Sequence, residues 1–159
     1  MFADDLCTDF TSGPVAVLID RAAIERLIPH SGSMCLLDTV VEWDSDTIVC
    51  GTASHRRADN PLLDSDGRLP AVILVEYGAQ AAAVHAGLLQ QTIGQGATAY
   101  IGAVKDLQLH AAVVDASIDV LQIQAQCLLT NNDGAIYRIQ CGTEHCSLVT
   151  ARVLLVLPN

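Results

Sequence analysis

The side chains best suited to catalysis are a histidine in a polar loop and a glutamate in an apolar helix. His55 begins the charged, proline-containing stretch HRRADNP, and Glu76 lies within the aliphatic stretch VILVEYGAQ. Burying an ionised carboxylate among aliphatic side chains costs several kcal/mol, so we expect Glu76 to be protonated or paired. An imidazole and a protonated carboxyl group can act as general base and general acid. The two residues therefore predict proton-transfer chemistry.

Two elements must position these groups. Residues 70–91 form the clearest predicted helix and are apolar on nearly all sides, which is typical of a helix buried in a core. Pro70 suits its start, where the missing N–H costs nothing. Residues 55–68 are predicted to form a loop, with turn signals at Asn60-Pro61 and Asp66-Gly67. The histidine is thus expected on a loop and the glutamate on a central helix.

The rest of the chain is rich in strand patterns. Asp20 can cap a short helix over residues 21–27, and Asn132-Asp133-Gly134 is a strong hairpin turn. A long antiparallel sheet needs a cover for its apolar face, and one long helix is available. We therefore expect an α+β fold with the sheet wrapped around that helix, as a single domain over residues 19–159 after an N-terminal arm, residues 1–18. The strands are predicted at residues 34–42, 47–54, 100–110, 117–130, 135–144 and 147–157.

Composition narrows the classes of partner. The 159 residues suffice for one domain, and 51% of them are hydrophobic, which argues against disorder. The net charge is −10 and Lys105 is the single lysine, so a nucleic-acid partner is not expected. No uninterrupted apolar run reaches about 18 residues, so no membrane span is expected.

The cysteines and the N-terminus indicate a reducing compartment. Six cysteines are present and none forms a CxxC pair. The acidic N-terminus, MFADDLCTDF, lacks the features of a signal peptide. We expect reduced, mostly structural thiols in a cytoplasmic protein. No metal site is expected, because the Cys and His residues do not cluster at ligand spacing.

Three segments in order carry a resemblance to a known family. LIPHSGSMCLLDTV, residues 27–40, is similar to LPHRxPFLLVD; His55 followed by Asn60-Pro61 is similar to HFPxNP; and the helix from Pro70 through Glu76 and Gln80 is similar to PGVLxxEAxAQ. The chain thus resembles the hotdog-fold 3-hydroxyacyl-acyl-carrier-protein dehydratases of the FabZ/FabA type. The motifs SHRxxDNPL and EYxAQAxAVH most resemble the ApeP-like dehydratases, which are associated with aryl-polyene and related pathways. The His-to-Asn spacing is one residue longer than in the motif, and about six residues are inserted within 62–69.

The resemblance implies a role for each catalytic group. His55 would remove the α-proton of a 3-hydroxyacyl thioester, and Glu76 would protonate the leaving hydroxyl to give a trans-2-enoyl product. A backbone N–H of Ala71 or Val72, at the start of the helix, would polarise the thioester carbonyl. Glu76 of one subunit would face His55 of the other, so the active unit would be a dimer or a heteromer with a related hotdog subunit. No cofactor is implied beyond the phosphopantetheine of the acyl carrier protein that carries the substrate.

Other side chains near these groups have two interpretations each. Gln80 lies one helical turn after Glu76 and either orients its carboxyl group or is satisfied by nearby backbone. His30 either shapes the wall of the active site or bonds a backbone carbonyl at the turn. Tyr77 is expected to be a packing residue. The arginines of the loop, Arg56, Arg57 and Arg68, either dock the acidic carrier protein or pair with Asp59, Asp64 and Asp66.

Two other functions compete with a dehydratase. A hotdog thioesterase would share the fold and one helix carboxylate but would attack the thioester carbon with water. The presence of both His55 and Glu76 favours the dehydratase. A non-catalytic subunit would pair with a related dehydratase and complete its site.

Overall fold

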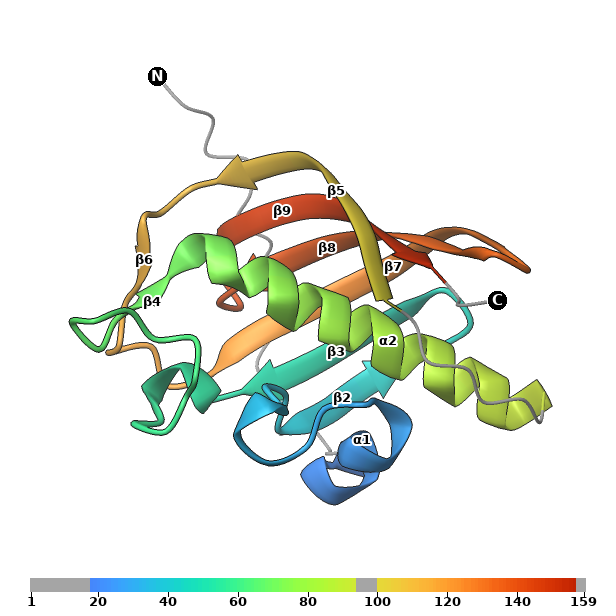
Figure 1. The fold of residues 1–159 in the computed structure, drawn as a ribbon, viewed down its shortest axis with the longest axis horizontal. Helices are drawn as coiled ribbons and strands as arrows, with labels where there is room; N and C mark the ends of the chain where they lie inside the picture. Colours follow the sequence, from blue (N-terminus) through green and yellow to red (C-terminus); the bar gives the residue numbers. More distant parts are fainter. Residues whose placement is uncertain (1–17, 94–99, 157–159) are drawn as a thin grey trace.

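A curved antiparallel sheet wraps around one long helix in the computed structural model, which describes residues 18–93 and 100–156 (Figure 1). The sheet has seven strands in the order β1-β2-β3-β7-β8-β9-β5, and β4 pairs with β6 in a separate two-stranded sheet. The predicted α+β architecture is confirmed. The elements are β1 (Ile19–Asp20), α1 (Arg21–Leu27), η1 (Gly32–Met34), β2 (Thr39–Trp43), β3 (Thr47–Thr52), η2 (Ser54–Arg56), β4 (Leu69–Pro70), η3 (Ala71–Ile73), α2 (Leu74–Ile93), β5 (Tyr100–Leu109), β6 (Val113–Val114), β7 (Leu121–Asn131), β8 (Gly134–Gly142) and β9 (Ser147–Val156).

Alternation of apolar and polar residues explains how the sheet packs on α2. In β7, Leu121, Ile123 and Ala125 are buried, whereas the intervening glutamines face outward. Small residues on α2 allow the sheet to approach closely. A Cβ at Gly78 would collide with the side chain of Ile139 on β8. The helix and the sheet therefore share one core.

The predicted helix ends are close to those observed. Helix α1 spans Arg21–Leu27 as expected, and the Asp20 carboxylate accepts a 2.9 Å hydrogen bond from the N–H of Ala23. The long helix begins with η3 and continues as α2 to Ile93. By length and composition alone, Ala71–Gln90 could cross a membrane, but most of it is buried in this fold. The expected arm, residues 1–18, lies outside the described residues except for Leu18.

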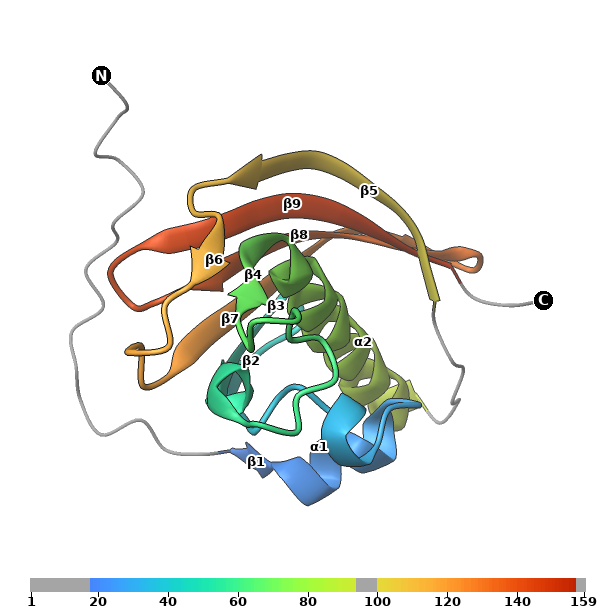
Figure 2. The ribbon, with the colours of Figure 1, turned by 60° about the vertical axis from the view of Figure 1, so that its left-hand side comes forward.

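The predicted strand at residues 34–42 is wrong in its first half. Strand β2 begins only at Thr39, because the backbone of Met34 and Leu36 bonds to the side chain of Gln80 rather than to a strand. The N–H of Leu36 donates to Oε1 of Gln80 at 2.9 Å, and the carbonyl of Met34 accepts from Nε2 of the same amide at 2.8 Å. The short pair β4 and β6 was not predicted, because two residues are too few to show alternation. Figure 2 shows this pair beside the N-terminal end of α2.

A buried histidine fastens α2 to the sheet far from the loop that follows β3. His85 is fully buried, and its Nε2 donates to the carbonyl of Asp44 at 2.8 Å. Its Nδ1 lies 2.8 Å from the hydroxyl of Tyr137, which must donate because Nε2 holds the ring proton. Burial lowers the pKa of His85, although the bond to Asp44 and the charges of Asp44 and Asp46 oppose that shift. The fold therefore holds His85 as the neutral imidazole.

The neutral His85 should make stability depend on pH. Its folded pKa lies below its unfolded value of about 6.5, so between these values the unfolded chain binds more protons and stability falls as the pH drops. We expect His85→Gln to lower stability at pH 7.5. It should also reduce the slope of unfolding free energy against pH between about pH 5 and pH 7, by at most about 1.4 kcal/mol per pH unit.

Urea unfolding of both proteins across that pH range measures the slope. His110→Gln is the matched control, because His110 is exposed. An unchanged slope in His85→Gln would show that His85 is not held neutral by the fold.

Candidate active site

The histidine of the candidate site is held in one tautomer. His55 lies in η2, directly after β3, and is only 5% exposed. Its Nε2 lies 2.7 Å from the carbonyl oxygen of Ile118, which can only accept, so Nε2 carries the ring proton. Nδ1 is then the basic nitrogen, and it is buried without a hydrogen-bond partner among the described residues. This geometry leaves a lone pair free to take a proton.

The surroundings of His55 also favour its neutral form. Burial lowers the pKa of His55, and the charge of Arg56 adds to this effect. The hydrogen bond to Ile118 and the charge of Asp38 act in the opposite direction, with a smaller result. A neutral imidazole is the form that a general base requires.

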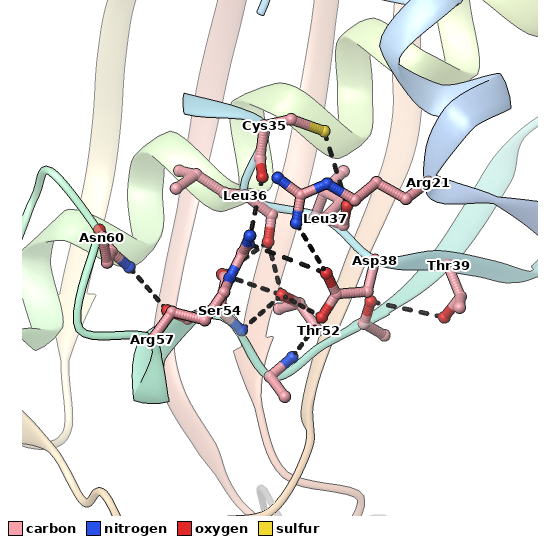
Figure 3. A network of polar contacts seen from close by, with 12 residues as sticks. Arg21, Cys35, Leu36, Leu37, Asp38, Thr39, Thr52, Ser54, Arg57 and Asn60 are labelled. Atoms are coloured by element: carbon pink, nitrogen blue, oxygen red, sulfur yellow. Dashed lines mark hydrogen bonds and ion pairs between the residues drawn. The ribbon is translucent and has the colours of Figure 1, made fainter. Parts of the chain in front are cut away.

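A partly exposed carboxylate, that of Asp38, holds the backbone just before η2 in place (Figure 3). Asp38 Oδ2 accepts from the N–H of Ala53 at 2.7 Å. Asp38 Oδ1 lies 3.4 Å from Nη1 of Arg21 and 3.8 Å from Nη2 of Arg57. Because Arg21 and Arg57 both face this carboxylate, the negative charge of Asp38 beside the turn from β3 into η2 is compensated.

The carbonyl of Leu36 joins three elements at one point. The hydroxyls of Thr52 and Ser54 lie 2.5 and 2.6 Å from this oxygen. The N–H of the same residue bonds to Gln80 on α2. Gln80 therefore supports the site indirectly. Its amide is occupied by the backbone at Met34 and Leu36 and makes no described bond to Glu76.

The glutamate is less buried than its helix neighbours suggest. Glu76 lies in the first turn of α2, and its side chain is 31% exposed, because the carboxyl group reaches the surface of the single chain. His30 Nε2 lies 3.8 Å from Glu76 Oε1, which is an ion-pair distance rather than a hydrogen bond. His30 thus lies against the candidate acid. Among residues 18–93 and 100–156, no hydrogen bond or ion pair joins His55 to Glu76.

The start of the helix offers one of the two expected backbone donors. The N–H of Ala71 already donates to the carbonyl of Ala112 at 2.9 Å, so Ala71 is corrected from a candidate donor to a structural contact. That bond accompanies the pairing of β4 with β6, which the sequence pattern did not reveal. Val72, the next residue, remains the candidate backbone donor, and its side chain is exposed.

The three loop arginines have different environments. Arg57 points inward, where its Nη2 donates to the carbonyl of Cys35 at 3.3 Å and faces Asp38. Arg68 pairs with Asp66 at 3.1 Å and with Asp64 at 3.5 Å, as the alternative interpretation expected. Only Arg56 is both exposed and adjacent to His55; it contacts the exposed Asp119 at 3.0 Å.

Sequence reasoning missed several residues that hold His55. Tyr77 is fully buried, as a packing residue would be, but its hydroxyl also contacts Ser54 and Asn60. The Asn-Pro pair after the histidine was the one available signal, because a motif asparagine that becomes buried needs partners for its amide. Ile118, more than sixty residues from His55 in sequence, gave no signal.

The described pocket and side-chain clusters do not enclose the catalytic pair. A pocket of about 720 Å³ lies beside Ile118, lined by residues of β2 and β3 such as Thr39 and Val49 and by the β8–β9 turn at His145. Neither His55 nor Glu76 lines it. Within the described part of the chain, no group of three or more His, Cys, Asp or Glu residues could hold a metal ion. This pocket therefore does not enclose the two candidate groups.

Solved structures confirm the hotdog fold. A chain of the dehydratase heterocomplex ApeI:P from Xenorhabdus doucetiae superposes with a TM-score of 0.77 at 23% identity, covering 86% of this chain and 91% of that one. A sigma28-regulated virulence protein from Campylobacter jejuni gives 0.62 at 13% identity, covering 93% and 96%. A hypothetical thioesterase with coenzyme A from Streptococcus pneumoniae gives 0.52 at 15% identity, covering 76% and 84%. At these identities the likeness concerns the fold alone.

The family is shown by the sequence itself. No curated protein matches the chain. The family described as ApeP-like, ApeP dehydratase, matches residues 22–159, which begin within α1 and include every later element. The chain therefore belongs to the ApeP-like family of dehydratases.

Proposed function

We propose that this protein is a cytoplasmic 3-hydroxyacyl-acyl-carrier-protein dehydratase that forms trans-2-enoyl thioesters in fatty-acid or aryl-polyene-like biosynthesis. The observation that carries the proposal is the state of His55. Its Nε2 proton is fixed on the carbonyl of Ile118, and its buried Nδ1 is free to accept a proton. Membership of a dehydratase family supports the same reaction class.

The reaction divides between the two catalytic residues. His55 Nδ1 takes the α-proton of the thioester, and the electron pair of that C–H bond moves toward the carbonyl. A backbone N–H at the start of α2, with Val72 as the candidate, stabilises the negative charge on the thioester oxygen. The bond from C3 to the hydroxyl oxygen then breaks as Glu76 donates a proton, so that water leaves. The proton on His55 later returns to Glu76 through solvent.

The pair must come from two chains in this proposal. Within one chain, Glu76 faces His30, and His55 faces Ile118. Among the described residues, strand β5 also lacks a cover: it is the last strand of the sheet, and it arches beyond α2 (Figures 1 and 2). Its inward-facing Ile101, Val104 and Leu109 are 40%, 40% and 49% exposed. An apolar strand with an open edge suits a second hotdog subunit.

The partner is proposed to be a related hotdog subunit or a second copy of this chain. The similar chain from Xenorhabdus doucetiae belongs to a dehydratase heterocomplex, ApeI:P, which favours a heteromer. A homodimer would use the same strand. Turnover by this chain alone would exclude a purely non-catalytic role.

Replacing the acid should abolish dehydration. We expect Glu76→Gln to lower turnover of a 3-hydroxyacyl-carrier protein by about 10² to 10⁴-fold, because Gln cannot donate the proton, and His55→Gln to act similarly. Mass spectrometry of the carrier protein, watching for loss of one water, measures this directly. His145→Gln, an exposed histidine paired with Glu144, is the control and should retain activity.

The same spectra separate the thioesterase alternative. Hydrolysis would release a free acid and leave an unloaded carrier protein. Unchanged dehydration in Glu76→Gln and His55→Gln would refute the assigned roles.

Reversing one exposed charge beside the site should weaken use of the carrier protein. We expect Arg56→Glu to raise KM for the acyl-carrier protein about tenfold with little change in kcat, because Arg56 is the exposed cation adjacent to His55. The effect should shrink at high salt. Arg138→Glu makes the same charge change on the exposed face of β8 and is the matched control. Equal effects of both substitutions would rule out local docking at Arg56.

A charge on the uncovered strand should break the assembly. We expect Val104→Asp to shift the protein, or its complex with a related subunit, to single chains in light scattering and to abolish turnover. Val120→Asp places the same charge on an exposed valine away from β5 and should change neither. An intact, active assembly of Val104→Asp would place the partner elsewhere.

A further inference from the structure

The residue after the candidate acid is tied to the residue before the candidate base. Tyr77 follows Glu76 on α2, and Ser54 precedes His55 in η2. The hydroxyl oxygens of Tyr77 and Ser54 lie 3.0 Å apart in the core. A direct link therefore joins the helix that carries one catalytic group to the short helix that carries the other.

Asn60 closes this link into a three-residue cluster, which we call the Tyr77 clamp: Tyr77, Ser54 and Asn60. The Asn60 amide nitrogen donates to the Tyr77 hydroxyl at 3.0 Å and to the Ser54 carbonyl at 2.9 Å. Its side-chain oxygen accepts from the N–H of Leu62 at 2.9 Å. All three members are buried, so water cannot readily replace a lost bond.

The hydroxyls of the clamp belong to one hydrogen-bond network. The Ser54 hydroxyl lies 2.6 Å from the carbonyl of Leu36, 2.9 Å from the hydroxyl of Thr52 and 3.0 Å from that of Tyr77. The Tyr77 hydroxyl accepts from Asn60, and Ser54 is the neighbour to which its own hydrogen can be donated. Burial raises the pKa of Tyr77, which keeps that hydrogen in place. The tyrosine hydroxyl is used fully, as donor and as acceptor.

The loop around His55 has few other anchors. Arg56, Ala58, Asp59 and Pro61 are exposed, and Asn60 is the buried residue among them. Asp38 fixes the turn before η2 through the N–H of Ala53, and its carboxylate together with the Cys35 carbonyl holds Arg57, the first residue after η2. The rest of that segment, residues 58–60, is held to the helix through Asn60 and Tyr77.

We infer that Tyr77 is a positioning residue for His55: its hydroxyl clamps η2 and the following loop to α2 and so keeps the imidazole buried against Ile118. The role of His55 as base rests on the proposed function, whereas the clamp itself does not. Tyr77 touches neither substrate nor reacting atoms in this proposal. It acts through the placement of His55.

The chain offers a matched control at Tyr137. This second buried tyrosine lies on β8, and its hydroxyl contacts His85 rather than a residue of η2. Tyr77→Phe and Tyr137→Phe each remove one buried hydroxyl and leave its partners unsatisfied. Both variants should therefore lose thermal stability, and only the first should affect His55.

The titration of His55 separates the loss of stability, which is expected in both variants, from an effect on His55, which is expected only in Tyr77→Phe. Histidine labelled with ¹³C and ¹⁵N gives the protonation midpoint of His55 by NMR on the full chain, with the resonance assigned from His55→Gln. In Tyr77→Phe we expect the midpoint to rise toward the ordinary value of about 6.5, because a loosened loop admits water. Tyr137→Phe should match the wild-type midpoint. Both variants leave the charged groups around His55 unchanged. Arg56 and Asp38 face His55, and Asp119 and Arg57 lie behind them.

Turnover supplies the second readout. We expect Tyr77→Phe to lower kcat for dehydration about tenfold with little change in KM, and to move the acid limb of kcat/KM to higher pH together with the NMR midpoint. Ser54→Ala, a smaller change, should shift the midpoint in the same direction if Tyr77→Phe fails to fold.

An unchanged His55 midpoint in Tyr77→Phe, or in Ser54→Ala if that variant has to replace it, would overturn the inference. If no variant and no wild-type protein dehydrates any substrate, the proposed function fails, and the NMR titration still decides the role of Tyr77.

Discussion

Side chains from distant elements, rather than a neighbouring strand, make hydrogen bonds to the backbone of Met34 and Leu36. Gln80 of α2 bonds Leu36 and Met34, and the hydroxyls of Thr52 and Ser54 bond the Leu36 carbonyl. A buried backbone group without a partner costs as much as a lost hydrogen bond. These bonds hold the segment before β2 in place, and they tie it to β3, η2 and α2.

The pairing of charged side chains near His55 involves the same segment, through Asp38. The protein has eight basic residues against eighteen acidic ones, and two of those basic residues, Arg21 and Arg57, face the single carboxylate of Asp38. This use of scarce cations stabilises the turn that leads to His55. It also leaves Arg56 as the exposed cation nearest the catalytic histidine, in a protein whose net charge of −10 repels an acidic partner. Recruitment of a carrier protein would then depend on local rather than overall charge.

The two candidate catalytic groups, His55 and Glu76, have different environments, which suit opposite proton transfers in the proposed reaction. His55 is buried and bonded at Nε2, so that Nδ1 remains basic and neutral. Glu76 lies partly exposed beside His30. In the proposed assembly, a partner subunit on the exposed inner face of β5 would enclose it. Burial of Glu76 would thus be a property of the assembly rather than of the chain.

Much of this protein could be predicted from local pattern. The Asp20 cap and α1, the long apolar helix, the turn at Asn132-Asp133-Gly134 and the α+β class depend on residues close in sequence, and the structure confirms each. The order of three motifs predicted the family. Local propensity and spacing carry these features, because capping, periodicity and turn formation act over a few residues.

Tertiary structure decided how the loop and the catalytic groups are held. Four features depend on partners between 17 and 46 residues away in the sequence. They are the lack of a strand over residues 34–38, the bond of the Ala71 N–H to Ala112, the inward course of Arg57 and the clamp of Tyr77. His55 bonds a carbonyl 63 residues later. A single sequence reveals which groups need a hydrogen-bond partner but not which distant group the fold brings to them, because that choice belongs to the packing of α2 within the sheet.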